Sequence, residues 1–160
     1  MSLPPLLHYE TVSEYRQHYE KHYQRGNIFT VDGIRVYFQP QKFGHAFYKN
    51  SQGKSGDKDV FAPERAQRMD WIRATLVHPD ARLYFGWNKA TRCYDEGRRV
   101  SVIYENFVVV IELGLTRKNE LRANFVTCYV ADASIEAIEN SPIWSKEKCL
   151  ENLNEIKKCR

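Results

Sequence analysis

Four short β-favouring segments follow one another between residues 82 and 130, and they limit the fold more than any other feature of the chain. They span residues 82–87, 100–104, 107–113 and 122–130. Glu105-Asn106 joins the second segment to the third, and a polar stretch at 116–120 joins the third to the fourth. Because neighbouring parallel strands need a long crossover, these short connections predict antiparallel pairing. We therefore expect an α+β fold with a roughly four-stranded antiparallel sheet.

The last of these segments alternates in character along its length. Successive side chains of a strand point to opposite faces of the sheet. One face would carry Phe125, Thr127 and Tyr129, and the other would carry Val126, Cys128 and Val130. The second set is apolar and is expected to face the core. Thr127 and Tyr129 are then expected to face an open, basic cleft.

A helix and a hairpin are predicted before the sheet. The segment that begins Thr11-Val12-Ser13-Glu14 has the form of a capping box, and Gly26 supplies a stop. Tyrosines recur every fourth residue between them, which is more typical of a packing face than of a platform for stacking bases; they are Tyr15, Tyr19 and Tyr23. Asp32-Gly33, between two β-favouring runs, predicts a hairpin over residues 27–38.

Further helices are expected before and after the sheet. Residues 63–77 begin with a proline and carry an apolar stripe at Met69, Ile72 and Leu76. Residues 132–139 predict a short helix, and Ser145 can cap a longer one. The polar, glycine-containing residues 50–59 are typical of a loop. We expect the helices to pack on one face of the sheet, beside the N-terminal helix and hairpin.

The whole chain, residues 1–160, is expected to form a single domain. A chain of 160 residues buries about 70% of its unfolded surface, which is enough for a core without metals or disulfides. We divide it into a helical and hairpin part at 10–77, a sheet at 82–130 and a helical tail at 132–160. No apolar run approaches the length of a membrane span, and no secretory leader is evident. These features predict a cytoplasmic protein without a membrane partner.

Metal and cofactor binding are not favoured by the sequence. His18 and His22 lie one helical turn apart, but no obvious third ligand accompanies them, so we interpret them as a surface pair. The four cysteines form no Cys-x-x-Cys motif and are interpreted as reduced, mostly structural thiols. A nucleophilic role for Cys128 is the minor alternative.

Positive charge is concentrated in two stretches of the chain. The formal net charge is only +4. Residues 35–58 carry five basic residues against one acidic residue, and residues 82–99 carry five against two. Segregated basic charge favours a polyanion-binding face, because each phosphate contact releases counterions. Solvated loops would show the same pattern, and both interpretations remain open at this point.

The usual nucleotide and hydrolase motifs are missing, but metal-free ribonuclease chemistry needs none of them. The chain has no P-loop, no Gly-x-Gly-x-x-Gly, no His-Glu-x-x-His and no Gly-x-Ser-x-Gly. RNA carries its own nucleophile, the 2′-hydroxyl. A protein then needs a proton carrier such as His45, a cation such as Arg92, and hydroxyls such as those of Tyr104 and Thr127. The product would be a 2′,3′-cyclic phosphate.

The order of these parts resembles a known family. The chain resembles the phage-associated branch of the Barnase–EndoU–Colicin–RelE ribonucleases in three features. It has a His in the N-terminal half and an Arg-bearing helix that ends in Leu76-Val77-His78-Pro79. Its strands at 107–111 and 125–129 end in a Thr-x-Tyr motif. The matching stretch runs from about His45 to Tyr129, and it departs from the family's pattern at Cys128 and in the long loop at 50–59.

The resemblance implies a helix on an antiparallel sheet, with the active site on the open face of the sheet. His45 would be the acid or base, and Arg92, Tyr104 and Thr127 would line the phosphate site. The residues expected to bind substrate are Lys42, Lys49, Arg65, Arg68 and Tyr129. The implied enzyme is toxin-like and acts on RNA, with tRNA as one candidate substrate and a cognate inhibitor protein as a further candidate partner.

Three hypotheses follow for the function. The first is a metal-independent endoribonuclease. The second is a non-catalytic module of the same fold that binds nucleic acid or a protein. The third is a structural or accessory protein of a phage. The sequence does not decide among them.

Overall fold

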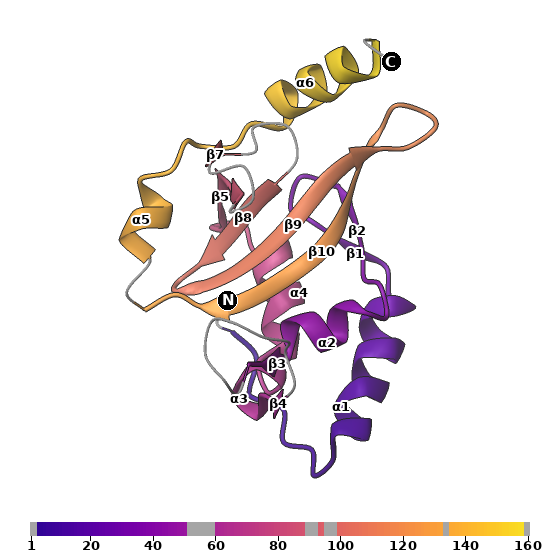
Figure 1. Ribbon diagram of the computed structural model, residues 1–160, viewed down its shortest axis with the longest axis vertical. Helices are drawn as coiled ribbons and strands as arrows, with labels where there is room; N and C mark the ends of the chain where they lie inside the picture. The colour runs from indigo at the N-terminus through magenta and orange to yellow at the C-terminus, as the bar shows by residue number, and fades with distance from the viewer. Residues whose placement is uncertain (1–2, 51–59, 89–92, 95–98, 133–134, 159–160) are drawn as a thin grey trace.

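The computed structural model describes residues 3–50, 60–88, 93–94, 99–132 and 135–158 (Figure 1). Its helices are α1 (Val12–Tyr19), the π-helical η1 (Glu20–Gln24), α2 (Lys42–Ala46), α3 (Pro63–Ala66), α4 (Met69–Val77), α5 (Ile135–Glu139) and α6 (Lys146–Lys158). Its strands are β1 (Ile28–Phe29), β2 (Arg35–Tyr37), β3 (Tyr48–Lys49), β4 (Val60–Phe61), β5 (Arg82–Phe85), β6 (Trp87–Asn88), β7 (Cys93–Tyr94), β8 (Arg99–Tyr104), β9 (Phe107–Leu115) and β10 (Leu121–Val130). The chain is therefore a mixed α and β protein.

The central sheet has six strands in the order β1-β2-β10-β9-β8-β5. The expected antiparallel core, β5-β8-β9-β10, is present. The expectation of a four-stranded antiparallel sheet is nevertheless wrong in extent, because the β1–β2 hairpin joins the sheet through a parallel pairing of β2 with β10. The long chain between β2 and β10 makes this parallel contact possible. Two small hairpins, β3–β4 and β6–β7, stand apart from the sheet.

The predicted hairpin forms around Asp32-Gly33. Gly33 has a positive φ of 81°, a conformation that glycine adopts without steric cost. The Thr30 backbone N–H donates to the Ile34 carbonyl at 2.9 Å, and the Ile34 N–H donates to the Thr30 hydroxyl at 3.1 Å. The local turn chemistry therefore produces the hairpin that the sequence predicts.

The alternation expected along β10 is broken by a bulge between Phe125 and Thr127. Phe125 and Cys128 both pack into the main core, although three residues separate them. Val126 packs instead into a smaller cluster on the opposite side of the sheet. The prediction that Val126 shares a core face with Cys128 and Val130 is wrong. The bulge inserts one extra residue, so the side chains after it point to the opposite faces from those that simple alternation predicts.

The tyrosine stripe of α1 and η1 is a packing face, as predicted. Tyr15, Tyr19 and Tyr23 are at most 3% exposed. Their buried hydroxyls remain paired: Tyr19 donates to the Gln39 carbonyl and Tyr23 to the Met69 carbonyl, each at 2.7 Å. The Thr11 hydroxyl accepts from the Glu14 N–H at 3.2 Å, which confirms the predicted N-cap.

The helix expected over residues 63–77 is divided into α3 and α4. The Gln67 carbonyl accepts a hydrogen bond from the Leu7 N–H at 2.8 Å, so the N-terminal segment occupies an acceptor that a continuous helix would use. The Trp71 N–H bonds to the Arg68 carbonyl instead. Arg68 lies at this break, directly before the first residue of α4.

Helices cover both faces of the sheet, not one. The main core joins α1, α2 and α4 to one face, and α4 lies behind β9 and β10 in Figure 1. On the other face, Ile135 and Ile138 of α5 pack on the smaller cluster around Val108 and Val110. The expectation of helices on a single face is therefore wrong for α5.

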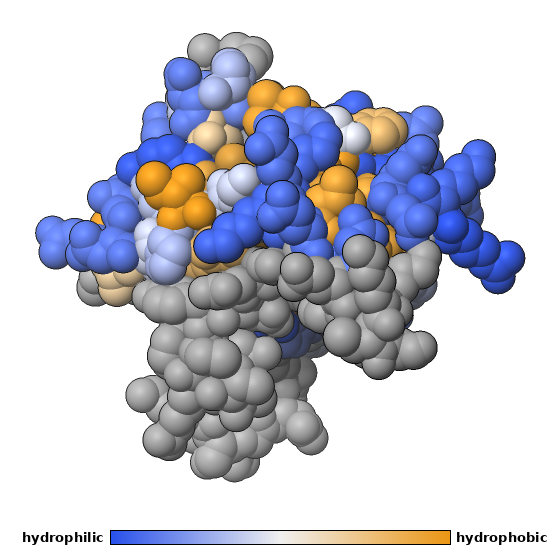
Figure 2. Space-filling view, turned by 90° about the horizontal axis from the view of Figure 1, so that it is seen from above, coloured by the Kyte–Doolittle hydropathy of each residue, from blue (hydrophilic) through white to orange (hydrophobic). Residues whose placement is uncertain are grey.

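The exposed surface is polar with scattered apolar patches. Figure 2 shows hydrophilic residues separating smaller hydrophobic groups on the face seen from above. Within the described residues, no helix is long and apolar enough to cross a membrane.

Candidate functional site

A pocket of about 200 Å³ lies where α3 meets the C-terminal end of β10. Its walls are Glu64, Arg65, Arg68, Phe107, Cys128, Tyr129 and Val130. The volume is below the 300–1,000 Å³ that is typical of pockets for whole cofactors. A small charged group, such as one phosphate, suits this space better than a complete nucleotide.

Two arginines supply the positive charge of the pocket. One amino group of Arg65 donates to the Tyr48 carbonyl at 3.2 Å. Arg68 donates to the Glu64 carbonyl, and its guanidinium lies 5.1 Å from the centre of the Trp71 ring. The Arg68 Nε is buried without a hydrogen-bond partner in the part of the chain that the structure describes. Each guanidinium has five N–H donors, so both retain capacity for an anionic ligand.

The pocket also contains an ionised carboxylate. The backbone N–H of Glu64 lowers the pKa of its own side chain, and Lys49 lowers it further. Lys49 Nζ lies 3.5 Å from the Glu64 carboxylate and offsets its charge. With Lys49 included, the immediate surroundings carry three positive charges and one negative charge.

Tyr129 and Cys128 form the strand side of the pocket. Burial raises the pKa of the Tyr129 hydroxyl, which therefore stays protonated at neutral pH and can donate a hydrogen bond. Cys128 is 2% exposed, and its role in the main core is structural. Cys128 and Tyr129 are opposite Val109 and Val108 of β9, one residue before Val130 pairs with Phe107 at the end of the two strands.

The structure brings together three of the residues predicted to bind substrate. Arg65, Arg68 and Tyr129 line the pocket, and Lys49 adjoins it through Glu64. Lys42 is half-buried at the start of α2 and, like the exposed His45 on the same helix, is not one of the described residues that line the pocket.

Of the residues predicted to be catalytic, His45, Tyr104 and Thr127 are not among the described residues that line the pocket. Arg92 lies outside the described residues. Tyr104 ends β8, where its ring stacks on His78 with centroids 3.8 Å apart. Thr127 is half-buried beside the bulge, opposite Val110. Strand spacing and rise place Thr127 roughly 14 Å from Tyr104, with β9 between them.

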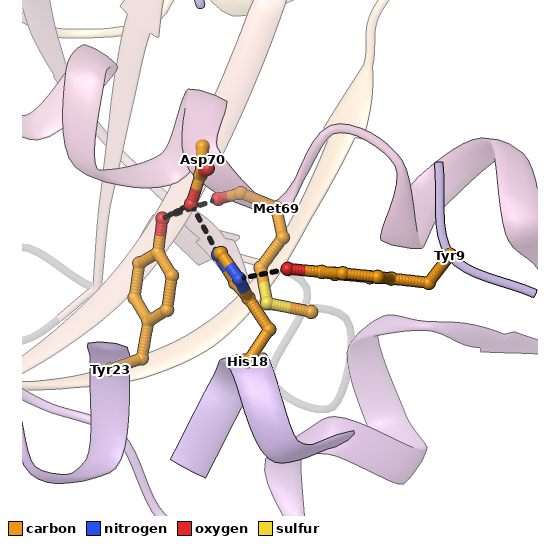
Figure 3. Close-up of polar contacts among 5 residues, drawn as sticks. All are labelled: Tyr9, His18, Tyr23, Met69 and Asp70. Carbon is orange, nitrogen blue, oxygen red and sulfur yellow. Dashed lines mark hydrogen bonds and ion pairs between the residues drawn. The ribbon is translucent and has the colours of Figure 1, made fainter. Parts of the chain in front are cut away.

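A second polar cluster connects the N-terminal segment, α1 and α4 (Figure 3). His18 Nε2 lies 2.7 Å from Asp70 Oδ1, and the Tyr9 hydroxyl lies 3.0 Å from His18 Nδ1. The Tyr23 hydroxyl is 3.1 Å from the same Asp70 oxygen. Because a carboxylate oxygen accepts, Nε2 of His18 donates to Asp70.

This cluster corrects the interpretation of His18 and His22 as a surface pair. The His18 side chain is only 10% exposed, whereas His22 is exposed and its ring centre lies 4.5 Å away. Slight burial, His18 and Lys21 lower the pKa of His22. No group of three His, Cys, Asp or Glu side chains suited to a metal occurs in the part of the chain that is described. We interpret the cluster as a clamp between segments.

Sequence reasoning missed Glu64 and Asp70, although signals for both exist. Glu64 directly precedes Arg65 and follows the helix-starting Pro63. His18 lies three residues after Tyr15, on the flank of the buried tyrosine stripe, which places it near the packing face. Asp70 is distant in sequence, and nothing local marks it as the partner of His18.

Comparison of the chain with protein families, with characterised proteins and with solved structures found no match. The function must therefore be argued from the pocket and the surface themselves.

Proposed function

We propose that this protein binds RNA and holds a backbone phosphate in the pocket between α3 and β10. The observation that carries the proposal is that Arg65, Arg68 and Tyr129 line the same space of about 200 Å³. Guanidinium groups form charge-assisted, often paired hydrogen bonds with phosphate oxygens, and a protonated hydroxyl adds a third donor. This combination favours a tetrahedral anion.

The pocket is expected to recognise the negative charge of a phosphate and not the base sequence of the RNA. Its donors would contact phosphate oxygens and carry no information on the bases. The apolar walls formed by Phe107 and Val130 lower the local dielectric, which strengthens the attraction of each arginine for the phosphate. We therefore expect salt-sensitive RNA binding with little dependence on the sequence at the contacted phosphate.

The test is binding of a fluorescein-labelled, 12-nucleotide RNA, followed by fluorescence anisotropy over a range of salt concentrations. We expect the Arg65→Gln/Arg68→Gln variant to weaken binding and to lower the slope of log K against log salt by about 0.7 for each lost phosphate contact. Arg73→Gln is the matched control, because Arg73 is exposed on α4 and is not among the residues that line the pocket. Equal affinity of the double variant and the control would reject the pocket as the RNA site.

Endoribonuclease activity is the second candidate, and the ionised Glu64 carboxylate in the same pocket favours it. Glu64 would accept the proton of the 2′-hydroxyl, and the 2′-oxygen would attack phosphorus. Arg65 and Arg68 would neutralise the crowded phosphorane, and the 5′-oxygen would leave with a proton from solvent. The products are a 2′,3′-cyclic phosphate and a 5′-hydroxyl. Glu64 would thus take the role that the sequence assigns to His45.

Cleavage is tested with RNA in the presence of a chelator, with Glu64→Gln and His45→Ala compared with the wild type. Loss of cleavage in Glu64→Gln alone supports the pocket mechanism, and loss in His45→Ala alone supports the assignment based on sequence. Equal cleavage by all three proteins indicates a contaminating nuclease and rejects the enzyme, as does the absence of cleavage. RNA with a 2′-O-methyl group at each position is the substrate control, because it lacks the nucleophile.

A further inference from the structure

Exposed aromatic rings alternate with arginines on the outer side of the β1–β2 hairpin. The arginine–aromatic ladder consists of Phe29, Arg35, Tyr37 and Arg122. The Arg35 guanidinium carbon lies 5.6 Å from the centre of the Phe29 ring and 5.0 Å from that of Tyr37. The Arg122 guanidinium carbon lies 4.5 Å from the Tyr37 ring centre.

Strand register explains why these four side chains lie on one face. Arg35 and Tyr37 are two residues apart on β2, while Val36 between them is buried in the main core. Phe29 pairs with Arg35 across the hairpin, and Arg122 of β10 pairs with Arg35 from the other side. The ladder therefore crosses three adjacent strands on the side of the sheet that faces away from the main core.

The rings of the ladder are exposed to an unusual degree for aromatic side chains. Phe29 is 42% exposed and Tyr37 is 39% exposed, and among the described residues only a few large apolar side chains match them. Farther along the same sheet face, Ile135 and Ile138 of α5 cover the apolar cluster around Val108. The ladder lies beyond that cover, at the end of the sheet formed by β1 and β2.

Neither Arg35 nor Arg122 forms an ion pair with another residue in the part of the chain that the structure describes. Glu112, directly opposite Asn124 in the sheet, forms an ion pair with Arg99 at 3.6 Å. Arg35 donates to the Gly26 carbonyl at 3.4 Å, which orients its guanidinium without neutralising it. The ladder thus presents two cationic groups and two ring systems on one open surface.

We infer that the ladder is a second binding surface, which takes the unpaired bases of single-stranded RNA. Unpaired bases stack on aromatic rings and on guanidinium planes, and the edges of the same guanidiniums remain available to phosphate oxygens. Paired bases in a duplex cannot stack on it, because their faces already contact neighbouring base pairs. The inference rests on the proposed function only in taking RNA as the ligand, since none of the four ladder residues lines the pocket.

The test compares a 12-nucleotide, uridine-rich RNA with a duplex of the same length, again by fluorescence anisotropy. We expect Phe29→Leu/Tyr37→Leu to weaken binding of the single strand by about tenfold or more, because each stacked base contributes substantially. Binding of the duplex should change less than twofold. Arg117→Gln is the matched charge control, because Arg117 is exposed in the β9–β10 turn, and it should change single-strand affinity little.

The outcomes separate the ladder from the pocket. If Phe29→Leu/Tyr37→Leu binds the single strand like the wild type while Arg65→Gln/Arg68→Gln does not, the ladder is rejected and the pocket stands. The reverse result rejects the pocket and supports the ladder. If the wild type binds no RNA, both are rejected.

A crosslinking experiment with the unaltered protein tests the same inference without relying on variants. RNA that contains 4-thiouridine is irradiated in the complex, and the crosslinked peptides are identified by mass spectrometry. Crosslinks in the peptides that contain Phe29 or Tyr37 support the ladder. Crosslinks found only elsewhere overturn it.

Discussion

His18 of α1 and Asp70 of α4, which are 52 residues apart in the chain, form a hydrogen bond of 2.7 Å between the two helices. The other nitrogen of the same ring contacts the Tyr9 hydroxyl, so one imidazole connects the N-terminal segment, α1 and α4. Asp70 is also the acceptor for Tyr23, whose side chain is 2% exposed. Removal of Asp70 would leave the His18 ring nitrogen without its acceptor, whereas the Tyr23 hydroxyl would keep its bond to the Met69 carbonyl.

We therefore predict that Asp70→Ala lowers the free energy of unfolding by about 1–2 kcal/mol. Part of the penalty is recovered by water, because the Asp70 side chain is 34% exposed. Urea denaturation followed by circular dichroism measures the change. Glu136→Gln, at an exposed position of α5, is the control and should change stability by less than about 0.5 kcal/mol. Equal midpoints for both variants would show that the clamp contributes nothing.

Interactions between residues close in sequence could be predicted, and pairings between distant segments could not. The Asp32-Gly33 hairpin and the tyrosine stripe follow from turn chemistry and helical period, and both are present. The parallel contact between β2 and β10 forms because β10 is an edge strand of the antiparallel sheet to which the hairpin can add. These two strands are distant in sequence, so no local sequence pattern indicates their pairing. Helix α2 contains only five residues, one of them Gly44, and its stability comes from burial of Phe43 and Ala46.

Burial of the tyrosine hydroxyls predicts a loss of stability at high pH. Burial raises the pKa of Tyr19 and Tyr23, and also that of Tyr129. The folded state favours the neutral phenol, so this contribution is fully present below the unfolded pKa of about 10 and is lost as the pH rises above it.

An alkaline titration followed at 295 nm tests this prediction. Of the ten tyrosines, these three should ionise only as the protein unfolds, whereas in guanidinium all ten should titrate together near pH 10. One smooth titration of all ten in the native protein would contradict the burial of these hydroxyls.

The difference in burial between Phe125 and Phe29 predicts that their truncation to alanine lowers the free energy of unfolding by different amounts. Phe125 is fully buried beside the bulge and stacks on Phe38 with ring centres 4.9 Å apart. Phe125→Ala should lower the free energy of unfolding by about 3–5 kcal/mol, through lost burial and the cavity left behind. Phe29→Ala, at a 42% exposed position, should cost about 1 kcal/mol or less. The midpoints of urea denaturation of the two variants measure this difference. Comparable losses of unfolding free energy would contradict the assignment of Phe125 to the core face of β10 and of Phe29 to the exposed face of β1.

The candidate site was partly predictable for the same reason as the fold. Arg65 and Arg68 are three residues apart, and a helical spacing places them on one side. Tyr129 was assigned to the open side of β10; it lines the pocket, but its ring also packs against the smaller cluster that α5 covers. Phe125 was assigned to the same side as Thr127 and Tyr129, but the bulge lies between Phe125 and Thr127, and Phe125 faces the main core. A bulge depends on tertiary packing, and the alternation of residues 125–130 contains no sign of it.

Glu64 gives a prediction in which binding and cleavage change in opposite directions. Its carboxylate is ionised at neutral pH and lines the pocket, so it repels a bound phosphate. Glu64→Gln removes this repulsion and leaves Lys49 without its counter-charge, which adds to the positive potential. We expect RNA affinity to rise about fivefold, which corresponds to about 1 kcal/mol for charges at short range in water.

If Glu64 is also the general base, the same variant should lose cleavage by a factor on the order of 10² or more while it binds RNA more tightly. Affinity by anisotropy and cleavage by gel electrophoresis, measured on the same samples, separate the two effects. Lys49→Gln is the opposite control, because loss of that cation should weaken binding. Weaker binding by Glu64→Gln would mean that the carboxylate positions the arginines through Lys49 and does not repel the ligand. In that case its loss of activity could not be assigned to proton transfer.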